Sequence, residues 1–381
     1  MKKVIAITGS RAEYGLAYPI FKALNAQRGI SFSLIITGMH LSPEFGNSFK
    51  EVEKDGFEIE AKIKSLFLED TGTAMAQSVG KSILGITEVL RRTNPDFLLV
   101  LADLGWALAG AIAGIYMNIP IVHLHGGEVS GNVDDSIRHS ITKLSHIHFT
   151  STKKSAKRII KMGEAPWRVY VVGAPGLDSI LHQRFVSPKI LAKNFHLNLE
   201  KPLLLVIQHS VTTEPKKAGK QMAETMEAIK GLKEQTIVIY PNSDAGGQTI
   251  IKVIEKHRRY PFIQIHKNLP HKVYLSLMKI SSVMIGNSSS GIIEAPSFHL
   301  PVVNIGNRQE GRERAENVVD VGYNRSTITK AIKKALYDKK FLEKVKRCKN
   351  PYGDGKTGPR VAKILSELEI TPKLLQKKIT Y

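Results

Sequence analysis

The sequence has little cysteine and no long apolar run, and each shortage excludes a class of protein. Cys348 is the single cysteine in 381 residues, which excludes an internal disulfide and a cysteine-based metal cluster. The longest apolar stretches, such as residues 97–102 and 202–207, have the length of strands, whereas a bilayer-spanning helix needs about 20 apolar residues. The apolar part of the N-terminus is too short for a signal peptide. We therefore expect a cytoplasmic protein with no membrane span.

Acidic residues are also scarce relative to basic ones. Asp and Glu number 34 against 55 Lys and Arg, which gives a formal net charge of +21. Such a charge can attract nucleic acid, anionic lipid or an anionic small substrate. The basic residues are spread over most predicted helices and are not interleaved with aromatic residues, so we expect no nucleic-acid binding. The excess charge would still attract a sugar nucleotide, whose diphosphate is anionic.

What the sequence does have is an alternation of short apolar runs with segments of helical periodicity. Continuous apolar runs are typical of strands in a parallel sheet that is covered on both faces. The alternation predicts an α/β fold of two doubly wound, Rossmann-like sheets. The predicted strands lie near residues 4–8, 32–36, 97–101, 121–124, 148–150, 169–172, 203–207, 237–240, 262–265, 283–285 and 302–305.

The length of the chain and a break in this alternation both favour two domains. Composition becomes polar and irregular around residues 187–202, so we place the interdomain link there. The predicted N-terminal domain covers residues 1–185 and the C-terminal domain residues 186–357, while a last helix in residues 358–381 would pack back on the first domain. Ligands of such sheets bind at the carboxyl ends of the strands, which predicts a site in the interdomain cleft.

Many side chains that can transfer protons follow the predicted strand at residues 121–124. A single residue of this kind would most simply be an exposed side chain of a polar loop. Several of them close together instead indicate an active site at the end of the strand. The cluster consists of His123, His125, Glu128, Asp134 and His139.

Asp103 directly follows another apolar strand and should point into the same cleft as His125 and Asp134. Several acid/base groups at neighbouring strand ends suit removal of a proton from one atom and donation to another. A metal site at His123, His125 and Asp103 is the alternative, but any strand places residues i and i+2 on one face, so we predict no metal. A Ser-His-Asp hydrolase is disfavoured because no Gly-x-Ser-x-Gly motif occurs.

Residues 287–296 are a candidate phosphate-binding turn. A strand ends there in Ser288, Ser289, Ser290 and Gly291 and is expected to open a helix, so N–H groups and the helix dipole would face an anion. Glu294, one turn further, could accept hydrogen bonds from ribose hydroxyls. The alternative is an ordinary helix cap with spare serines.

A second candidate turn follows the first predicted strand. Gly9-Ser10-Arg11 could bring free N–H groups and a guanidinium to a phosphate or a uracil carbonyl, although a plain loop explains it equally well. The turn is not a Gly-x-Gly-x-x-Gly fingerprint, so we predict no dinucleotide cofactor.

Taken together and in order, these motifs resemble the hydrolysing UDP-N-acetylglucosamine 2-epimerase family. The similarity is greatest to the branch that serves sialic-acid-like sugars, including legionaminic-acid enzymes that act on a 2,4-diacetamido-6-deoxy sugar nucleotide. The residues that carry the resemblance are 9–15, 123–128, 134–139, 172–178, 241–247, 287–296 and 307–312.

The resemblance implies a GT-B architecture, a UDP-sugar substrate between the domains, and a homodimer or homotetramer, and we expect no cofactor. It also implies the reaction: UDP leaves by elimination as the C2 proton is removed, water adds to the glycal, and the free 2-epimer is released. A C2–H bond that has no carbonyl group beside it is barely acidic. Cleavage of the C1–O bond must therefore be more advanced than removal of the C2 proton. Stabilisation of the leaving diphosphate is then central.

The resemblance also assigns site residues. Asp103 and Asp134 match acid/base carboxylates, His125 stands where many members have a catalytic Glu, and His209 matches a histidine beside the leaving diphosphate. The predicted catalytic set is Asp103, His125, Glu128, Asp134 and His209, and the predicted binding set is Arg11, Tyr14, Ser288, Ser289, Ser290, Gly291, Glu294 and Arg308.

The chain departs from the family pattern after Asp103. Leu104 and Trp106 stand where relatives carry an Arg and an acidic residue, so Asp103 is expected to lack the guanidinium that favours its ionised form. Two alternatives to the epimerase therefore stay open: a GT-B glycosyltransferase, and a UDP-sugar-binding homologue that has lost catalysis.

Overall fold

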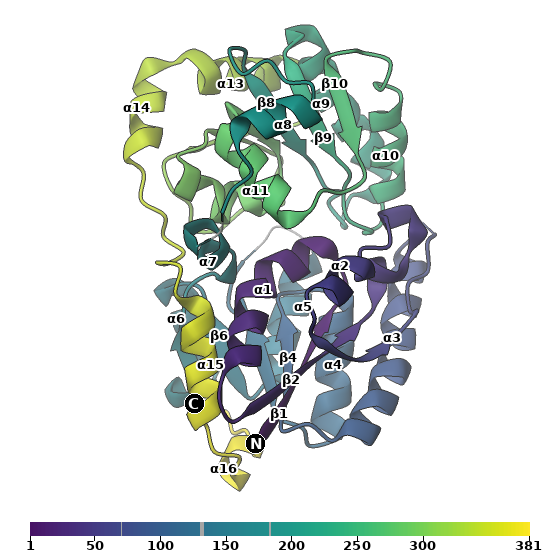
Figure 1. Cartoon of the computed structure of the whole chain (residues 1–381), viewed down its shortest axis with the longest axis vertical. Coiled ribbons are helices and arrows are strands. Elements are labelled where there is room, and N and C mark those ends of the chain that lie inside the picture. Colours follow the sequence, from purple (N-terminus) through teal and green to yellow (C-terminus); the bar gives the residue numbers. More distant parts are fainter. Residues whose placement is uncertain (70, 130–132, 183) are drawn as a thin grey trace.

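The chain forms two α/β halves that lie end to end along the long axis of the molecule (Figure 1). The computed structural model describes residues 1–69, 71–129, 133–182 and 184–381. Each half has one parallel sheet with helices on both faces. None of the helices in this part of the chain combines the length and the apolar character that a membrane span requires.

The first half contains a seven-stranded parallel sheet of order β3-β2-β1-β4-β5-β6-β7. Its central strands are continuous apolar runs, as expected for strands buried on both faces. The strands are β1 (Lys2–Thr8), β2 (Ile30–Ile36), β3 (Glu58–Lys62), β4 (Phe97–Leu101), β5 (Ile121–Leu124), β6 (Ile147–Thr150) and β7 (Val169–Val171).

The second half contains a six-stranded parallel sheet of order β10-β9-β8-β11-β12-β13. Its strands are β8 (Leu203–Ile207), β9 (Gln235–Ile239), β10 (Ile263–His266), β11 (Val283–Gly286), β12 (Val302–Ile305) and β13 (Val318–Val321). All eleven predicted strands are present, and the α/β class with two doubly wound sheets is confirmed.

The order of strands reverses once in each sheet. In the first sheet the chain moves outward from β1 to β2 and β3 and then returns to place β4 on the other side of β1. The second sheet repeats this between β8 and β11. Loops diverge at such points and leave a crevice at the carboxyl ends of the strands. Asp103 follows β4 and Ser288 follows β11, so both lie at these reversals.

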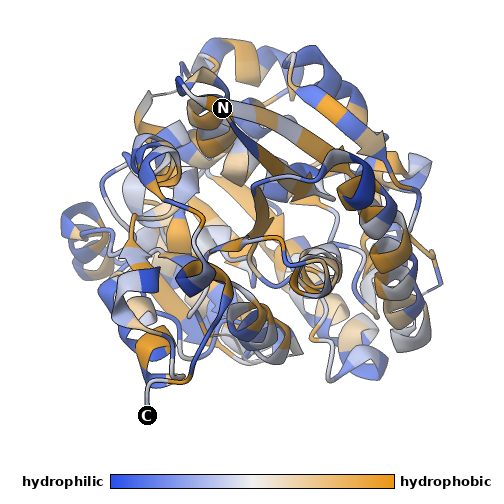
Figure 2. Ribbon diagram, turned by 90° about the horizontal axis from the view of Figure 1, so that it is seen from below, coloured by the Kyte–Doolittle hydropathy of each residue, from blue (hydrophilic) through white to orange (hydrophobic). Residues whose placement is uncertain are grey.

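Apolar side chains fill the space between each sheet and its helices, and Figure 2 shows the apolar strands enclosed by helices with mixed surfaces. The helices are α1 (Arg11–Ala26), α2 (Phe49–Lys54), α3 (Gly72–Thr93), α4 (Gly105–Tyr116), α5 (Val133–Leu144), α6 (Lys153–Lys161), α7 (Pro175–His182), α8 (Pro188–Asn194), α9 (Ala218–Leu232), α10 (Gly247–Glu255), α11 (His271–Ile280), α12 (Ser290–Ile293), α13 (Arg325–Tyr337), α14 (Lys339–Arg347), α15 (Thr357–Glu367) and α16 (Pro372–Leu375).

The end of the chain crosses back to the first half. Helix α15 packs on α1, and Val361 and Leu365 belong to the same buried cluster as Val4 (Figure 1). Gly358 permits this close approach, because a Cβ there would lie 2.6 Å from the carbonyl oxygen of Pro19. Two buried N–H groups at the start of α15 donate to the carboxylate of Asp178 on α7.

Two sequence-based expectations were wrong at the level of elements. Residues 187–202 are not an irregular link, because they contain α8, whose Leu191 is buried in the core of the second half. The edge strands β3 and β13 were not predicted. Their residues are only partly buried or exposed, so they lack the continuous apolar signal of central strands.

Candidate active site

The strand ends of the two sheets meet at an ion pair. Asp134, in the first turn of α5, lies 3.3 Å from a guanidinium nitrogen of Arg308, which follows β12 in the other half. Residues that the sequence analysis placed in separate halves are therefore in direct contact. We call Asp103, His125 and Asp134 the first-sheet wall, and His209, Ser288, Glu294 and Arg308 the second-sheet wall.

Asp103 is paired with an arginine, contrary to the expectation from Leu104. The buried guanidinium of Arg138, from α5, forms an ion pair with the Asp103 carboxylate. Arg138 also contacts Asp135 at 3.1 Å and the carbonyl of Glu128 at 3.2 Å. The neighbouring strand end is constrained as well, because Ala102 adopts a left-handed backbone (φ 58°) that non-glycine residues rarely adopt. Asp103 thus has a guanidinium partner from another helix although Leu104 follows it in the chain.

His125 likewise has a left-handed backbone, at φ 61°, directly after β5. Its Nδ1 lies 2.8 Å from the hydroxyl of Ser151, which fixes the ring. Burial and then the charge of Arg312 lower the pKa of His125 to about 3. The imidazole is therefore neutral at physiological pH and a weaker base than a free imidazole, and it can still exchange hydrogen bonds through its ring nitrogens.

His123 does not converge with His125. Its Nε2 donates to the carbonyl of Ala102 at 2.7 Å, and its Nδ1 lies 3.2 Å from the hydroxyl of Thr142. Burial lowers the pKa of His123 to about 3. Among the described residues, no three His, Cys, Asp or Glu side chains form a group that could hold a metal ion. His123 is instead a support beneath the loop that carries Asp103.

His209 follows β8 and presents a defined tautomer. The backbone N–H of Asn242 donates to its Nδ1 at 3.1 Å, so the ring hydrogen is on Nε2. Burial and then the charge of Arg308 lower the pKa of His209 to about 3. A neutral imidazole beside an arginine is suited to donate a hydrogen bond from Nε2 to a phosphate oxygen.

Arg308 is held by the loop after β11. It donates to the carbonyl of Asn287 at 3.3 Å, and Gln309 donates to the same carbonyl at 2.9 Å. Asp244 is close to this group: burial and then the charge of Asp134 raise the pKa of Asp244 to about 6, while Arg308 opposes the shift. The charge of Arg308 therefore acts on two carboxylates where the halves meet, in direct contact with Asp134 and through its electrostatic effect on Asp244.

The serine-rich turn differs from its prediction. Helix α12 is a single turn, and the N–H groups of Gly291 and Ile292 already donate to carbonyls of Ser288 and Ser289. A long helix dipole is therefore not directed at the site, and that part of the prediction was wrong. Gly291 serves packing, since a Cβ there would lie 2.9 Å from Val302. An anion at this turn would meet serine hydroxyls and Arg308.

Glu294 lies at the end of α12 and is 1% exposed. Within the described part of the chain, neither of its carboxylate oxygens has a hydrogen-bond partner. Burial raises the pKa of Glu294 to about 7, although the nearby Ser290 hydroxyl and the backbone N–H of Glu294 itself, which lie too far or too oblique for a well-formed hydrogen bond, oppose the shift. A buried acceptor without a donor is costly, and a ligand hydroxyl would relieve that cost.

Three predicted site residues have other roles. Tyr14 is in the core of the first half, and its hydroxyl donates to Asp55 at 2.6 Å, so its predicted place in the binding site stays a prediction. Glu128 accepts from the hydroxyls of Ser155 at 2.5 Å and Tyr352 at 3.4 Å, and it thereby links the halves.

Arg11 also bridges the halves, at the opposite end of their contact from Arg308. It pairs with Glu51 and donates to the side chain of Asn268. Asn132, inside the predicted site loop, lies outside the described residues.

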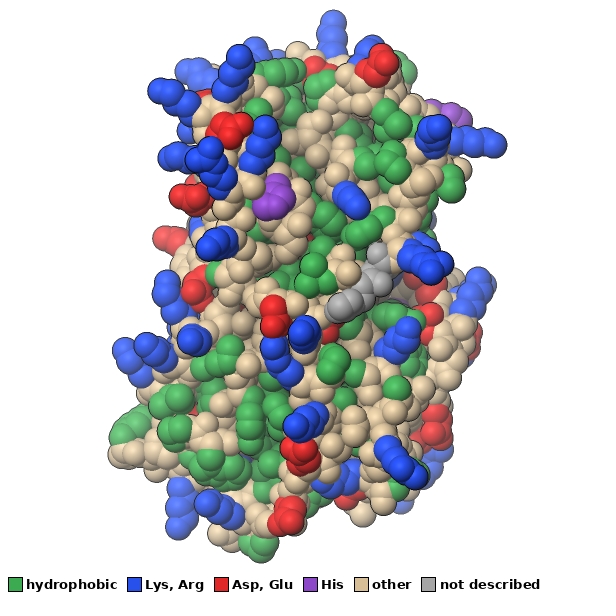
Figure 3. Space-filling model, turned by 60° about the vertical axis from the view of Figure 1, so that its left-hand side comes forward, with side chains coloured by type: hydrophobic (Ala, Val, Ile, Leu, Met, Phe, Trp, Pro, Cys, Tyr) green, Lys and Arg blue, Asp and Glu red, His purple; other side chains and the backbone are tan. Residues whose placement is uncertain are grey.

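Sequence reasoning missed an arginine cluster. Burial first, and then the charges of Arg312, Arg308 and Arg158, lower the pKa of the Arg138 guanidinium, so these four arginines lie close together, and of them only Arg308 had been predicted in the site. Arg312 also reaches across the halves to the carbonyl of Val129 at 3.1 Å. Arg138 and Arg312 lie within motifs that were recognised, so the signal was present but was not assigned. Elsewhere Lys and Arg are scattered with acidic neighbours, as on the face shown in Figure 3.

A cavity of about 930 Å³ lies next to this site but belongs to the second half alone. Its lining includes Lys220, Asn307, Arg314 and Tyr323. Basic and acidic side chains both line it, so it is not an obvious anion site.

Comparison with known proteins agrees with this geometry. The sequence profile of a family described as UDP-N-acetylglucosamine 2-epimerase matches residues 22–366. A Legionella pneumophila protein named UDP-N,N'-diacetylbacillosamine 2-epimerase (hydrolyzing) is 40% identical over 381 residues, which is 100% of both chains. A Campylobacter jejuni protein named GDP/UDP-N,N'-diacetylbacillosamine 2-epimerase (hydrolyzing) is 36% identical over 84% of each chain.

Solved structures show the same fold. The crystal structure of UDP-GlcNAc 2-epimerase from Neisseria meningitidis bound to UDP-GlcNAc has a TM-score of 0.80 at 19% identity, covering 95% of this chain and 99% of that one. The GT-B-type arrangement of two Rossmann-like halves is confirmed by this similarity.

Proposed function

The chain belongs to the UDP-N-acetylglucosamine 2-epimerase family, and from that premise we propose that it is a hydrolysing 2-epimerase of a UDP-activated N-acetylated aminosugar. The single observation that carries the proposal is the contact of Asp134 with Arg308. It joins a set of proton-transfer groups from one sheet to a phosphate-binding group from the other. An enzyme that expels a diphosphate and also removes a proton from the sugar needs the phosphate-binding group and the proton-transfer groups close enough to act on the same substrate molecule.

The proposed substrate is the UDP-activated 2,4-diacetamido-2,4,6-trideoxy sugar, with UDP-N-acetylglucosamine as the second candidate. Support comes from the full-length similarity to the Legionella relative, whose name specifies UDP-N,N'-diacetylbacillosamine. The product is then the free 2-epimer of the diacetamido sugar, or N-acetylmannosamine from the second candidate, for synthesis of sialic- or legionaminic-type acids.

In the first proposed step the C1–O bond to the diphosphate breaks and its electron pair leaves with UDP. Arg308 and the Nε2–H of His209 stabilise the charge that develops on the phosphate oxygens. The C2 proton is transferred to the first-sheet wall, and a C1=C2 double bond forms. Glu294 accepts hydrogen bonds from the ribose.

In the second step a proton is delivered to the opposite face of C2, the electron pair of the C1=C2 double bond forms the new C–H bond, and the oxygen of water bonds to C1 while the proton that water loses returns to the first-sheet wall. We assign these proton transfers to the set of Asp103, His125 and Asp134. Arg138 holds Asp103, Ser151 holds His125, and Arg308 contacts Asp134. Groups fixed in this way need little reorganisation during the reaction.

The test is to incubate the protein in deuterated water with each candidate sugar nucleotide and to follow UDP and the free sugar by NMR. We expect UDP release together with one deuterium at C2 of an inverted product. Release of UDP without deuterium at C2 would reject the epimerase and favour simple hydrolysis.

The same assay separates a GT-B glycosyltransferase, which would require an acceptor for UDP release. The hypothesis of lost catalysis had depended on Leu104 and Trp106, and the pairing of Asp103 with Arg138 removes part of its basis. The homodimer or homotetramer and the cytoplasmic location stay predictions, and sedimentation of the purified protein would test the first.

A further inference from the structure

Helix α5 receives its C-terminal cap from the far end of the chain. We call residues 371–381 the C-terminal tail. The ammonium group of Lys377, in this tail, donates to the carbonyls of Lys143 at 2.7 Å, Thr142 at 3.3 Å and Ser145 at 2.5 Å. The carbonyls of Lys143 and Ser145 lie at and just beyond the end of α5, where the helix offers no further N–H donors, whereas the Thr142 carbonyl also accepts from the backbone N–H of Ser145 at 3.2 Å. A cation there also opposes the negative end of the helix dipole.

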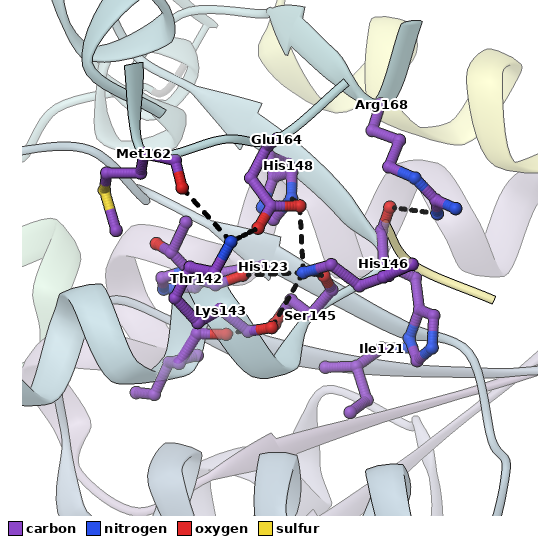
Figure 4. A network of polar contacts seen from close by, with 12 residues as sticks. Ile121, His123, Thr142, Lys143, Ser145, His146, His148, Met162, Glu164 and Arg168 are labelled. Carbon is purple, nitrogen blue, oxygen red and sulfur yellow. Dashed lines mark hydrogen bonds and ion pairs between the residues drawn. The ribbon is translucent and has the colours of Figure 1, made fainter. Parts of the chain in front are cut away.

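A buried carboxylate anchors this cap. Glu164 is 1% exposed in its side chain and accepts from Lys143 at 2.6 Å, Lys377 at 2.9 Å and His148 at 3.3 Å. Burial alone would raise the pKa of Glu164, but the hydrogen bonds from these three residues outweigh it and lower the pKa to about 2. Figure 4 shows Glu164 between Lys143 and His148 in this network.

The tail is fixed by contacts that do not involve Lys377. Arg168 donates to the carbonyls of Leu374 at 2.8 Å and Lys373 at 2.6 Å, and also to the carbonyl of His146 at 3.0 Å. Leu374 is buried in the core of the first half. Removing the Lys377 ammonium should therefore leave the tail docked while it deletes the cap and one of the three partners of Glu164.

Helix α5 connects this cap to the first-sheet wall by two routes. Its first turn contributes Asp134, and Arg138 one turn later pairs with Asp103. Near its end, Thr142 contacts Nδ1 of His123, whose Nε2 donates to the carbonyl of Ala102 just before Asp103. Both routes end at groups to which we assign proton transfer.

We propose that Lys377 is a positioning residue for the epimerase reaction: it caps α5 and thereby sets the placement of Asp103 and Asp134. The proposal rests on the proposed function, since it names the same proton-transfer groups. UDP would be bound chiefly by the second-sheet wall. Loss of the cap should therefore lower turnover and leave UDP affinity unchanged.

The experiment compares Lys377→Met with Lys378→Met, a control at the next position, whose side chain is exposed. For Lys377→Met we expect kcat to fall about tenfold, because small misplacements of reacting groups are costly. The dissociation constant for UDP should stay within about twofold of wild type, since the binding groups are remote. Lys378→Met should match wild type, and Lys377→Arg should restore most of kcat because its guanidinium can also cap carbonyls.

Amide hydrogen exchange provides a readout that is independent of turnover. Exchange in residues 133–144 should become roughly tenfold faster in Lys377→Met than in Lys378→Met. Unchanged exchange in α5, or faster exchange with a wild-type kcat, would overturn the proposal, as would equal losses of kcat and UDP affinity. If Lys377→Met does not yield folded protein, Lys377→Gln is measured against the same criteria.

Failure of the proposed function would look different. Wild-type protein that releases no UDP from either sugar nucleotide would reject the epimerase, whereas the exchange comparison would still show whether Lys377 holds α5. A wild-type enzyme that is active, with α5 insensitive to Lys377→Met, would reject the positioning role alone.

Discussion

The two walls of the site differ in how their polar groups are satisfied. In the first-sheet wall, Asp103 pairs with Arg138, and Ser151 contacts the ring of His125. In the second-sheet wall, both oxygens of Glu294 and the Nε of Arg308 have no hydrogen-bond partner among the described residues. The polar groups of the first-sheet wall thus have partners within the protein. The second-sheet wall contains buried polar atoms that a bound ligand could supply with hydrogen bonds.

This difference suggests a division of labour. Groups that transfer protons must be in place before the reaction, which the ion pairs and the left-handed strand ends of the first wall achieve. Groups that hold a nucleotide can gain their partners on binding. Substitutions in the first wall should therefore affect turnover, whereas substitutions in the second should affect affinity and the stability of the ligand-free protein.

The largest expected effect comes from Asp103→Asn. We expect turnover to fall on the order of a hundredfold or more, as for loss of a positioned acid/base group, with UDP affinity within a few fold of wild type. Steady-state kinetics and calorimetry with UDP measure the two quantities. Asp354→Asn, at an exposed ion pair with Arg360, is the matched control. A fully active Asp103→Asn enzyme would take Asp103 out of the mechanism.

Glu294→Gln should change how stability depends on pH. Burial raises the pKa of Glu294 to about 7 from 4.5, so between these values the folded protein holds a proton that the unfolded chain has released. The stability of the wild type should therefore decline, relative to Glu294→Gln, by up to about 3 kcal/mol as pH rises from 4.5 to 7.

Urea unfolding of both proteins at several pH values measures this difference, with the exposed Glu200→Gln as control. Saturating UDP should reduce the difference, because ribose hydroxyls would stabilise the ionised carboxylate. If the difference in unfolding free energy between the two proteins did not change with pH, the pKa of Glu294 would not be raised by burial. The carboxylate would then not be the poorly satisfied group that we assign to the second-sheet wall.

Arg308→Met should lower UDP affinity by roughly tenfold to a hundredfold, the value of one or two hydrogen bonds to a charged group. Arg314→Met is the control, since Arg314 follows the same strand but pairs with Asp320. Because Arg308 also contacts Asp134, turnover should fall as well. An unchanged UDP dissociation constant would break the assignment of Arg308 to the diphosphate.

The sequence was sufficient for the features that depend on continuous patterns. Apolar runs between helical segments predicted every central strand, and polar residues after β4, β5 and β11 predicted where the two walls would lie. The sequence was not sufficient where a side chain contacts a residue that is distant in the chain. The guanidinium beside Asp103 comes from α5, so inspection of Leu104 alone led to the wrong expectation. The edge strands β3 and β13 were missed and the length of α12 was overestimated, because these short segments have no periodic signal.

Tyr14→Phe should have the smallest effect and sharpens the boundary of the site. The sequence placed Tyr14 with the nucleotide, whereas the structure places its ring in a cluster with Phe21 and Phe57 and its hydroxyl on Asp55. Loss of that hydrogen bond should lower the free energy of unfolding by about 1 kcal/mol. Turnover and UDP affinity should stay at wild-type values, since the aromatic packing is retained. A drop in UDP affinity without a loss of stability would return Tyr14 to the binding site and would extend the second-sheet wall into the first half.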